Sequence, residues 1–284
     1  MLFSAITYLL LTFFTLLVIY PLYFMLIASF SDPNATNAGR VIWRPVNVTF
    51  EGYRMILQDS KVWNGYKNSL IYTLCAVTVN ILCTIPAAFT LSRKEVPGHS
   101  LFMLIITLTM FFSGGMIPTY IVVKDLGLIN SPLAVILPSA VMTYYLIISR
   151  TFFQNTIPEE LREASFVDGS GWMTFFFRIV LPLSRPILAV MVLFYTVHHW
   201  NSYFQAMLYL RDENLYPLQL ILRNILVDSE ATMADEASAI AEKQRQTELI
   251  KYGIIMVASV PVLVLYPFVQ KYFVQGMMIG AVKG

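Results

Sequence analysis

Long apolar runs alternate with polar stretches along this chain. Six of the runs are near the ~20 residues that a helix needs to cross the hydrocarbon core of a bilayer. They are residues 6–30, 69–91, 101–121, 134–153, 187–208 and 249–269. The pattern therefore predicts an all-α membrane protein with six transmembrane helices, in which residues 1–284 form a single transmembrane domain.

The composition supports a membrane location. Hydrophobic residues make up 57% of the 284 residues and charged residues only 13%, against about 25% in a typical soluble domain. The mean hydropathy is +0.65. A net charge of +2 without a dense basic patch gives no reason to expect nucleic acid as a partner. The lipid bilayer is the expected surrounding.

The basic residues predict the orientation. With the N-terminus inside, the inner segments are residues 92–100, residues 150–186 and the C-terminal tail, and they carry eight Lys or Arg against five acidic residues. The outer segments carry ten against twelve, so the raw count does not decide. The short loop with Arg93 and Lys94 does, because the positive-inside rule acts on short loops. We expect a multi-pass protein with both termini in the cytoplasm.

Three polar segments are expected on the outer side: residues 31–68, 114–132 and 211–248. The first contains an amphipathic piece at residues 51–57, and the second is typical of a re-entrant or interfacial stretch. The third begins with residues 216–227, whose apolar positions have helical spacing. These positions are Leu218, Ile221, Leu222, Ile225 and Leu226. The acidic, Ala-rich remainder, residues 228–248, predicts a solvated helix.

The stretch between the fourth and fifth spans, residues 157–186, is the most informative. Pro158 stands at a helix start, Glu159 and Glu160 fall in the first turn, where carboxylates suit the helix dipole, and Gly169 is a good C-terminal stop. The pattern predicts a short amphipathic helix on the cytoplasmic side, within residues 157–171. The residues expected on one face are Leu161, Ala164, Ser165 and Asp168.

Such a helix between two spans has two interpretations. It could be a rigid lever that a soluble partner grips in order to move both attached spans. It could instead be an interfacial helix that rests on the lipid headgroups. The residue pattern by itself leaves both open.

A motif in the same stretch carries a resemblance to a known family. Glu163-Ala164-Ser165 is followed after three residues by Gly169, and then by Ile179 and Leu181-Pro182. The spacing resembles the Glu-Ala-Ala, Gly and Ile-x-Leu-Pro signature of permease subunits of bacterial ATP-binding-cassette (ABC) importers, with Ser165 in place of an Ala. Most of the chain is similar to the sugar-importing branch, which includes the smaller permease of the maltose transporter and permeases of polysaccharide and uronide systems. The segments that carry this similarity are residues 28–33, 52–53, 67–70, 91–93, 112–120, 199–201, 272–276 and 280–284.

The resemblance implies a type I ABC importer permease fold in the bacterial inner membrane, and a set of partners. These are a second related permease, two ABC ATPase subunits, an extracytoplasmic solute-binding protein and an oligosaccharide. The short helix would dock on one ATPase. The residues that the resemblance places in this coupling are Glu163, Ala164, Ser165, Asp168 and Gly169.

The chain lacks a Gly-x4-Gly-Lys-Ser/Thr phosphate loop, so we expect a permease and not an enzyme. ATP and Mg would bind to the partner ATPases, and neither a cofactor nor a metal is expected in this chain. The long outer loop, residues 211–248, resembles the family's loop that reaches the binding protein; it could contact that protein or the sugar, or be solvated without specific contact.

The outer half of the fifth span is the candidate lining of the solute pathway. Polar side chains at membrane depth are costly unless they face protein or water, and sugars bind to aromatic faces and to amide and hydroxyl groups. The candidates are His199, Trp200, Asn201, Tyr203 and Gln205. Three other interpretations stay open: a metal pair of His198 and His199, an interfacial aromatic belt, and hydrogen bonding between helices.

Two other functions compete with oligosaccharide import. One is the same importer architecture with a non-sugar solute. The other is a secondary transporter or channel, for which carboxylates within the spans are expected and here are nearly absent. A membrane enzyme is less favoured again, because no paired carboxylates or metal-ligand cluster lies in the predicted spans.

Overall fold

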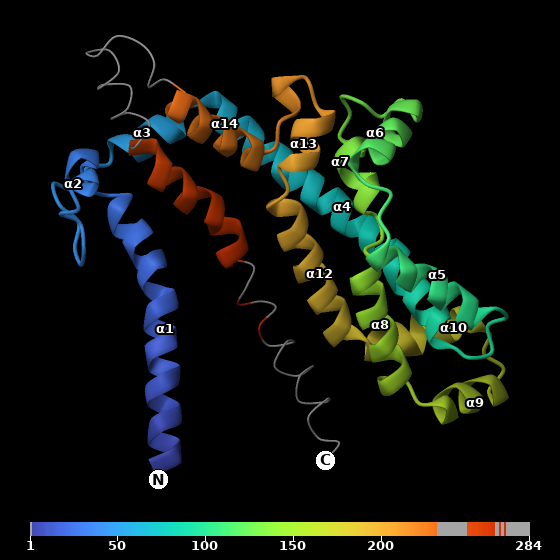
Figure 1. The fold of residues 1–284 in the computed structure, drawn as a ribbon. Helices are drawn as coiled ribbons and strands as arrows, with labels where there is room; N and C mark the ends of the chain where they lie inside the picture. Colours follow the sequence, from blue (N-terminus) through green and yellow to red (C-terminus); the bar gives the residue numbers. More distant parts are fainter. Residues whose placement is uncertain (1, 232–248, 265–266, 268–269, 271–284) are drawn as a thin grey trace. The chain divides into compact units, whose positions relative to one another are not determined.

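A computed structural model describes residues 2–231, 249–264, 267 and 270, and the part described is helical without any strand. The chain divides into two compact units (Figure 1). One unit comprises Met1–Tyr66 and Leu218–Pro261, and the other comprises Lys67–Pro217 and Val262–Gly284. An all-helical fold follows from the sequence, because within a bilayer a helix satisfies its backbone polar groups internally.

The first unit contains a long apolar helix and several amphipathic ones. Its labelled helices are α1 (Leu2–Ala28), α2 (Pro33–Asn37), α3 (Glu51–Gln58) and α14 (Leu218–Ala231), together with the start of α4 (Ser60–Ser92). A further apolar helix is Leu249–Val264. The amphipathic helices predicted at 51–57 and 216–227 are confirmed, since α3 buries Ile56 and α14 buries Leu218 and Ile221. Residues 232–248 of the predicted solvated helix lie outside the described residues.

Gly52 of α3 lies against the backbone of Leu249, where a Cβ at position 52 would overlap the carbonyl oxygen. Gly52→Ala is therefore expected to lower the stability of the protein by about 1–3 kcal/mol, the usual effect of overpacking. The measurement is thermal unfolding of the detergent-purified protein. Gly171→Ala is the matched control, because nothing lies within 4 Å of its Cβ position, and an equal effect of the two changes would contradict this packing.

The second unit holds the remaining helices. They are the rest of α4, α5 (His99–Phe111), α6 (Met116–Asp125), α7 (Leu133–Ile136), η1 (Leu137–Ser139), α8 (Thr143–Thr156), α9 (Glu159–Val167), α10 (Trp172–Phe175), η2 (Phe176–Val180), α11 (Leu181–Leu183), α12 (Arg185–Trp200), α13 (Phe204–Tyr209) and η3 (Glu213–Leu215). Its core includes Phe89 of α4, Phe153 of α8, Phe175 of α10 and Tyr195 of α12. Figure 1 shows α9 at the end of this unit, beyond α8.

The predicted count of six spans is only partly reached in the described residues. Two helices, Phe3–Ala28 and Ser60–Ser92, are long and apolar enough to cross a membrane alone. Three bent pairs raise this number to five if each pair is one span. The last predicted span corresponds to the shorter apolar helix Leu249–Val264, and most residues after it are not described.

Three predicted spans are not the continuous helices that hydropathy indicated, and in residues 134–153 the segments Leu133–Ser139 and Thr143–Thr156 meet at 47°. In residues 101–121 the helix ends at Phe111, and the axis turns by 113° before α6. Gly115 permits the turn with a φ of +87°, which most side chains disfavour. In residues 187–208, α12 ends at Trp200 because Asn201 folds back, and its Nδ2 donates to the carbonyl of Val197 at 2.9 Å.

Candidate functional site

The predicted helix between the fourth and fifth spans is confirmed as α9. Pro158 precedes it with an extended backbone, and Glu159 and Glu160 occupy its first turn. It stops before Gly169, whose φ of +83° is left-handed. The chain then enters α10, so α9 connects two membrane-directed segments through short links.

The two faces of α9 differ in exposure. Ser165 is buried, and Leu161, Arg162 and Phe166 are half-buried on the side that packs against the unit. The other side is exposed. It carries Glu163, Ala164, Val167 and Asp168, with Val167 87% exposed.

The predicted face of Leu161, Ala164, Ser165 and Asp168 is not uniform in exposure, because Ser165 is buried and Leu161 half-buried whereas Ala164 and Asp168 are exposed. The aromatic Phe166 and the stem of Arg162, which the pattern left out, contribute to the contact. Ala164 and Asp168 face outward together with Glu163. Of the five proposed coupling residues only Ser165 is buried, and Gly169 lies in the exposed turn.

An aromatic cluster fixes the buried face of α9. The ring of Phe166 meets Trp172 edge-on with a centroid distance of 5.1 Å, and it lies 6.2 Å from Phe175. Phe89 of α4 continues the cluster through Trp172 and Phe175. Edge-to-face aromatic pairs contribute about 0.5–1.5 kcal/mol each beyond area burial, so the helix is held as a rigid part of the unit.

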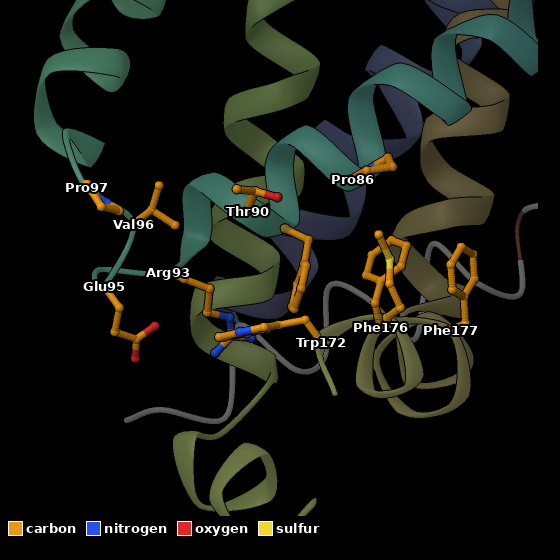
Figure 2. A pocket seen from close by; sticks show the side chains of 11 residues that line it. Pro86, Thr90, Arg93, Glu95, Val96, Pro97, Trp172, Phe176 and Phe177 are labelled. Carbon is orange, nitrogen blue, oxygen red and sulfur yellow. The ribbon is translucent and has the colours of Figure 1, made fainter. Parts of the chain in front are cut away.

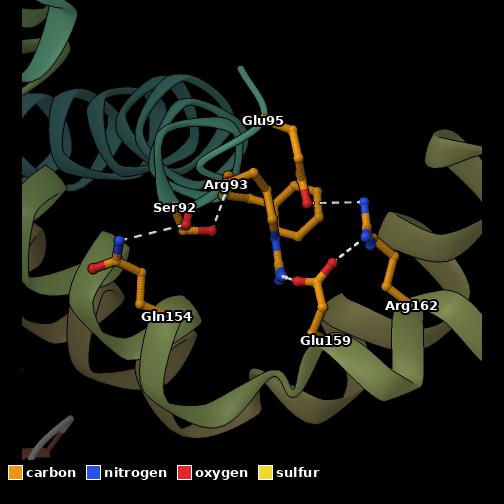
Figure 3. A network of polar contacts seen from close by, with 7 residues as sticks. Ser92, Arg93, Glu95, Gln154, Glu159 and Arg162 are labelled. Atoms are coloured by element: carbon orange, nitrogen blue, oxygen red, sulfur yellow. Dashed lines mark hydrogen bonds and ion pairs between the residues drawn. The ribbon is translucent and has the colours of Figure 1, made fainter. Parts of the chain in front are cut away.

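An ion-pair network joins α9 to the short loop after α4 (Figure 3). Arg162 Nη1 lies 3.0 Å from Glu95, and Arg162 also pairs with Glu159 one turn earlier. Glu159 in turn lies 3.6 Å from Nη1 of Arg93, whose side chain is only 6% exposed. The sequence pattern indicates for Arg93 only a part in the orientation of the chain in the membrane, and it does not predict this network.

The guanidinium of Arg93 is stabilised from two sides. Its carbon lies 4.9 Å from the centroid of the Phe89 ring, a cation–π distance. Burial lowers the pKa of Arg93, while the carboxylates of Glu159 and Glu95 act in the opposite direction. An arginine stays charged in proteins, so the result is a buried cation that depends on these carboxylates.

A cavity of about 630 Å³ adjoins the network (Figure 2). It is lined by Pro86, Phe89, Thr90, Arg93, Glu95, Val96, Pro97, Trp172, Met173, Phe176 and Phe177. Arg93, Glu95 and Trp172 lie toward one end of it in the figure, and Phe176 and Phe177 toward the other. Arg93 is thus placed between the carboxylates beside α9 and a largely apolar space.

Glu163 differs from the other charged groups of this region. Among the described residues it has neither an ion pair nor a side-chain hydrogen bond, although Glu159, four residues earlier, is fully engaged. A carboxylate presented on a rigid helix without a partner among the described residues is available to a cation of another molecule.

The candidate pathway residues of the fifth span separate into two groups. His199 and Trp200 are buried within the unit, and His199 Nε2 lies 2.8 Å from Oδ1 of Asn80. The structure therefore gives His199 the role of hydrogen bonding between helices, one of the interpretations that the sequence left open. The rings of His198 and His199 are nearly perpendicular, at 82°.

The remaining pathway candidates lie beyond the end of α12. Asn201 and Tyr203 are exposed, and Asn201 uses its amide to cap its own helix. Gln205 is half-buried and donates to Oγ of Ser139 at 3.1 Å, while its Oε1 has no partner in the part of the chain that the structure describes. Tyr203 and Gln205 thus keep hydrogen-bonding capacity, and their place in a solute pathway stays a prediction.

Asn80 of α4 hydrogen-bonds to the backbone at a break in the fourth predicted span. The helical segments Leu133–Ser139 and Thr143–Thr156 meet at 47°, which leaves backbone carbonyls free between them. Asn80 Nδ2 donates to the carbonyls of Ser139 and Ala140, at 2.5 and 2.9 Å. Since its amide nitrogen faces two acceptors, its oxygen must accept, and His199 Nε2 therefore carries the proton.

Tyr195 of α12 completes this arrangement. Its hydroxyl is 2.7 Å from Oγ1 of Thr84 and accepts from the backbone N–H of Met142 at 3.4 Å. Three helices thus meet at the break through buried polar side chains. Isolated polar residues such as Asn80 and Thr84 in an apolar span are the signal by which the sequence could have revealed it.

Comparisons with known proteins agree with this architecture. No protein-family model matches the chain. It is 38% identical to the polygalacturonan/rhamnogalacturonan transport system permease protein YtcP of Bacillus subtilis (strain 168), over 100% of this chain and 99% of that protein. Protein LplC of the same organism is 38% identical over 84% of this chain and 81% of its own length. A chain in a crystal structure of a bacterial ABC transporter, involved in the import of the acidic polysaccharide alginate, matches with a TM-score of 0.84, 32% identity and 96% coverage of both chains.

Proposed function

Because the chain belongs to the permease family of sugar-importing ABC transporters, we propose that its solute is an oligosaccharide of an acidic polysaccharide. The family resemblance seen in the sequence is confirmed, and the chain is a transmembrane permease subunit of an ABC importer. Two of its relatives are named for transport of polygalacturonan or alginate, which are polymers of acidic sugars. This agreement supports the substrate class.

The observation that carries the coupling part of the proposal is the exposed, unpaired carboxylate of Glu163 on α9. The buried face of α9 is fixed by aromatic and ionic contacts, so a force on the exposed face moves the helix as a body. A partner ATPase that grips this face would transmit its closure to the spans. The ATPases would bind ATP and Mg, and this chain would change access to the solute pathway.

The remaining parts of the assembly complete the proposal. A second permease would form the pathway together with this chain, and a solute-binding protein would deliver the sugar from outside. With α9 on the cytoplasmic side, both termini face the cytoplasm and the loop of residues 211–248 faces outward. The small basic loop that contains Arg93 and Lys94 then lies inside, as the positive-inside rule expects.

The other candidate functions receive less support. A secondary transporter would need titratable groups for ion coupling, and neither Phe3–Ala28 nor Ser60–Ser92 contains an acidic residue. A non-sugar solute is disfavoured by relatives that are named for saccharides.

The test is solute-stimulated ATP hydrolysis by the complete complex in proteoliposomes. We expect oligogalacturonates or alginate oligosaccharides to raise the hydrolysis rate, whereas their methyl esters, which keep the sugar backbone but lose the charge, should not. Stimulation by neutral oligosaccharides such as raffinose would contradict the acidic class. No response to any saccharide would contradict sugar import.

A further inference from the structure

We infer that Arg93 is a positioning residue that ties α9 to α4, so that displacement of the coupling helix reaches the second span directly. The inference rests on the proposed function, because it assumes that a partner ATPase moves α9. It adds a route that chain connectivity does not supply, since α9 is covalently joined only to α8 and α10.

Polar contacts connect α9 and the C-terminal end of α4. The pairs Glu159–Arg93 and Arg162–Glu95 connect α9 to the residues just after α4. Behind them, Arg150 Nε of α8 donates to the carbonyl of Leu91 at 2.8 Å, and its Nη2 lies 3.2 Å from His99 Nε2. The C-terminal end of α4 is therefore held by ionic contacts to α9 and by a hydrogen bond to α8.

Because Arg93 is buried, its ion pair with Glu159 has to be kept when α9 moves. A cation that is 6% exposed is costly unless a carboxylate compensates it, and Glu159, itself 46% exposed, supplies that carboxylate. When α9 moves, separation of Glu159 from Arg93 would leave that charge uncompensated. The lower-energy response is for α4 to follow.

The geometry of Arg93 also suits a moving partner. Nη1 lies 3.6 Å from Glu159, while Nε and Nη2 are buried without a hydrogen-bond partner among the described residues. The guanidinium has five N–H donors in a fixed fork, so it can exchange one donor for another as the carboxylate shifts. A packed apolar contact would lose its energy over the same displacement.

The position of Asn80 shows where a displaced α4 would act. Asn80 is twelve residues before Ser92 on the same helix, about 18 Å along the axis at 1.5 Å per residue. It holds the carbonyls at the break between η1 and α8. A shift of α4 would therefore move Asn80 and could change the bend of the fourth span at this break.

The experiment measures transported solute per ATP hydrolysed in the reconstituted complex, together with ATPase assembly by co-purification and thermal stability. Glu159→Gln keeps the size and removes the charge, and we expect the complex to assemble while transport per ATP falls about tenfold. Glu159→Asp keeps the charge and should restore part of the transport per ATP. Asp125→Asn is the control, since Asp125 is exposed at the end of α6, away from α9, and is unpaired among the described residues; transport per ATP should stay unchanged in this variant.

The double variant Arg93→Met with Glu159→Gln separates coupling from folding. It removes both charges, so stability should return toward the unsubstituted level while transport per ATP stays low. Recovery of both quantities would overturn the inference, because Arg93 would then serve the fold alone. An unchanged ratio in Glu159→Gln would overturn it as well. A different variant tests the proposed function: it would be contradicted if Glu163→Ala left ATPase assembly and transport intact.

Discussion

Glu163→Ala is expected to abolish transport and solute-stimulated ATP hydrolysis while leaving the stability of this chain unchanged. Glu163 has no partner among the described residues, so the folded chain loses no contact. In the assembled importer its carboxylate would pair with a cation of the ATPase. Truncating one member of such a buried interfacial pair costs about 2–5 kcal/mol, and each 1.4 kcal/mol is tenfold in affinity. The ATPase should therefore bind at least about 30-fold more weakly.

The measurements are ATPase co-purification, transport in proteoliposomes and thermal unfolding of the isolated chain. Asp125→Ala is the matched control, because it removes an exposed and unpaired carboxylate at the end of α6, away from α9. It should leave all three quantities unchanged. Normal transport by Glu163→Ala would show that the exposed face of α9 does not carry the coupling.

Local chemistry accounts for the parts of the molecule that the sequence predicted well. A proline, two acidic residues and a glycine set the start and the end of α9 without help from distant residues. The same holds for α3, whose apolar spacing alone specifies one buried face. The motif spacing from Glu163 to Pro182 indicates the ABC importer permease family without any knowledge of tertiary contacts.

The unpredicted features depend on residues that are far apart in the chain. Nothing local to Arg93 indicates that Glu159 will lie beside it. The packed face of α9 is set by Trp172 and Phe175, which lie outside the helix, so its own periodicity did not indicate Phe166 and Arg162 as contact residues. Hydropathy averages over a window, and therefore it also missed the turn at Gly115 within an apolar run.

Asn80→Leu is expected to destabilise the protein by several kcal/mol and to stop transport. The substitution keeps the approximate volume but removes the donor to the carbonyls of Ser139 and Ala140 and the acceptor for His199. Each buried polar group left unsatisfied costs about 1–3 kcal/mol, and three are affected. Interhelical hydrogen bonds in membrane proteins average nearer ~0.6 kcal/mol, so the total for the three groups is about 2–9 kcal/mol.

Thr78→Val is the control that isolates this effect, with thermal unfolding of the purified protein as the measurement. Thr78 lies on an exposed side of the same helix, and among the described residues its hydroxyl bonds only to the carbonyl of Leu74. Its loss should change stability by no more than ~0.5 kcal/mol, as for most surface substitutions. Similar stability of the two variants would show that the carbonyls at the break do not need Asn80. If Asn80→Leu is destabilised as expected, adding His199→Leu should cost little more, because the first change has already removed the partner of that ring.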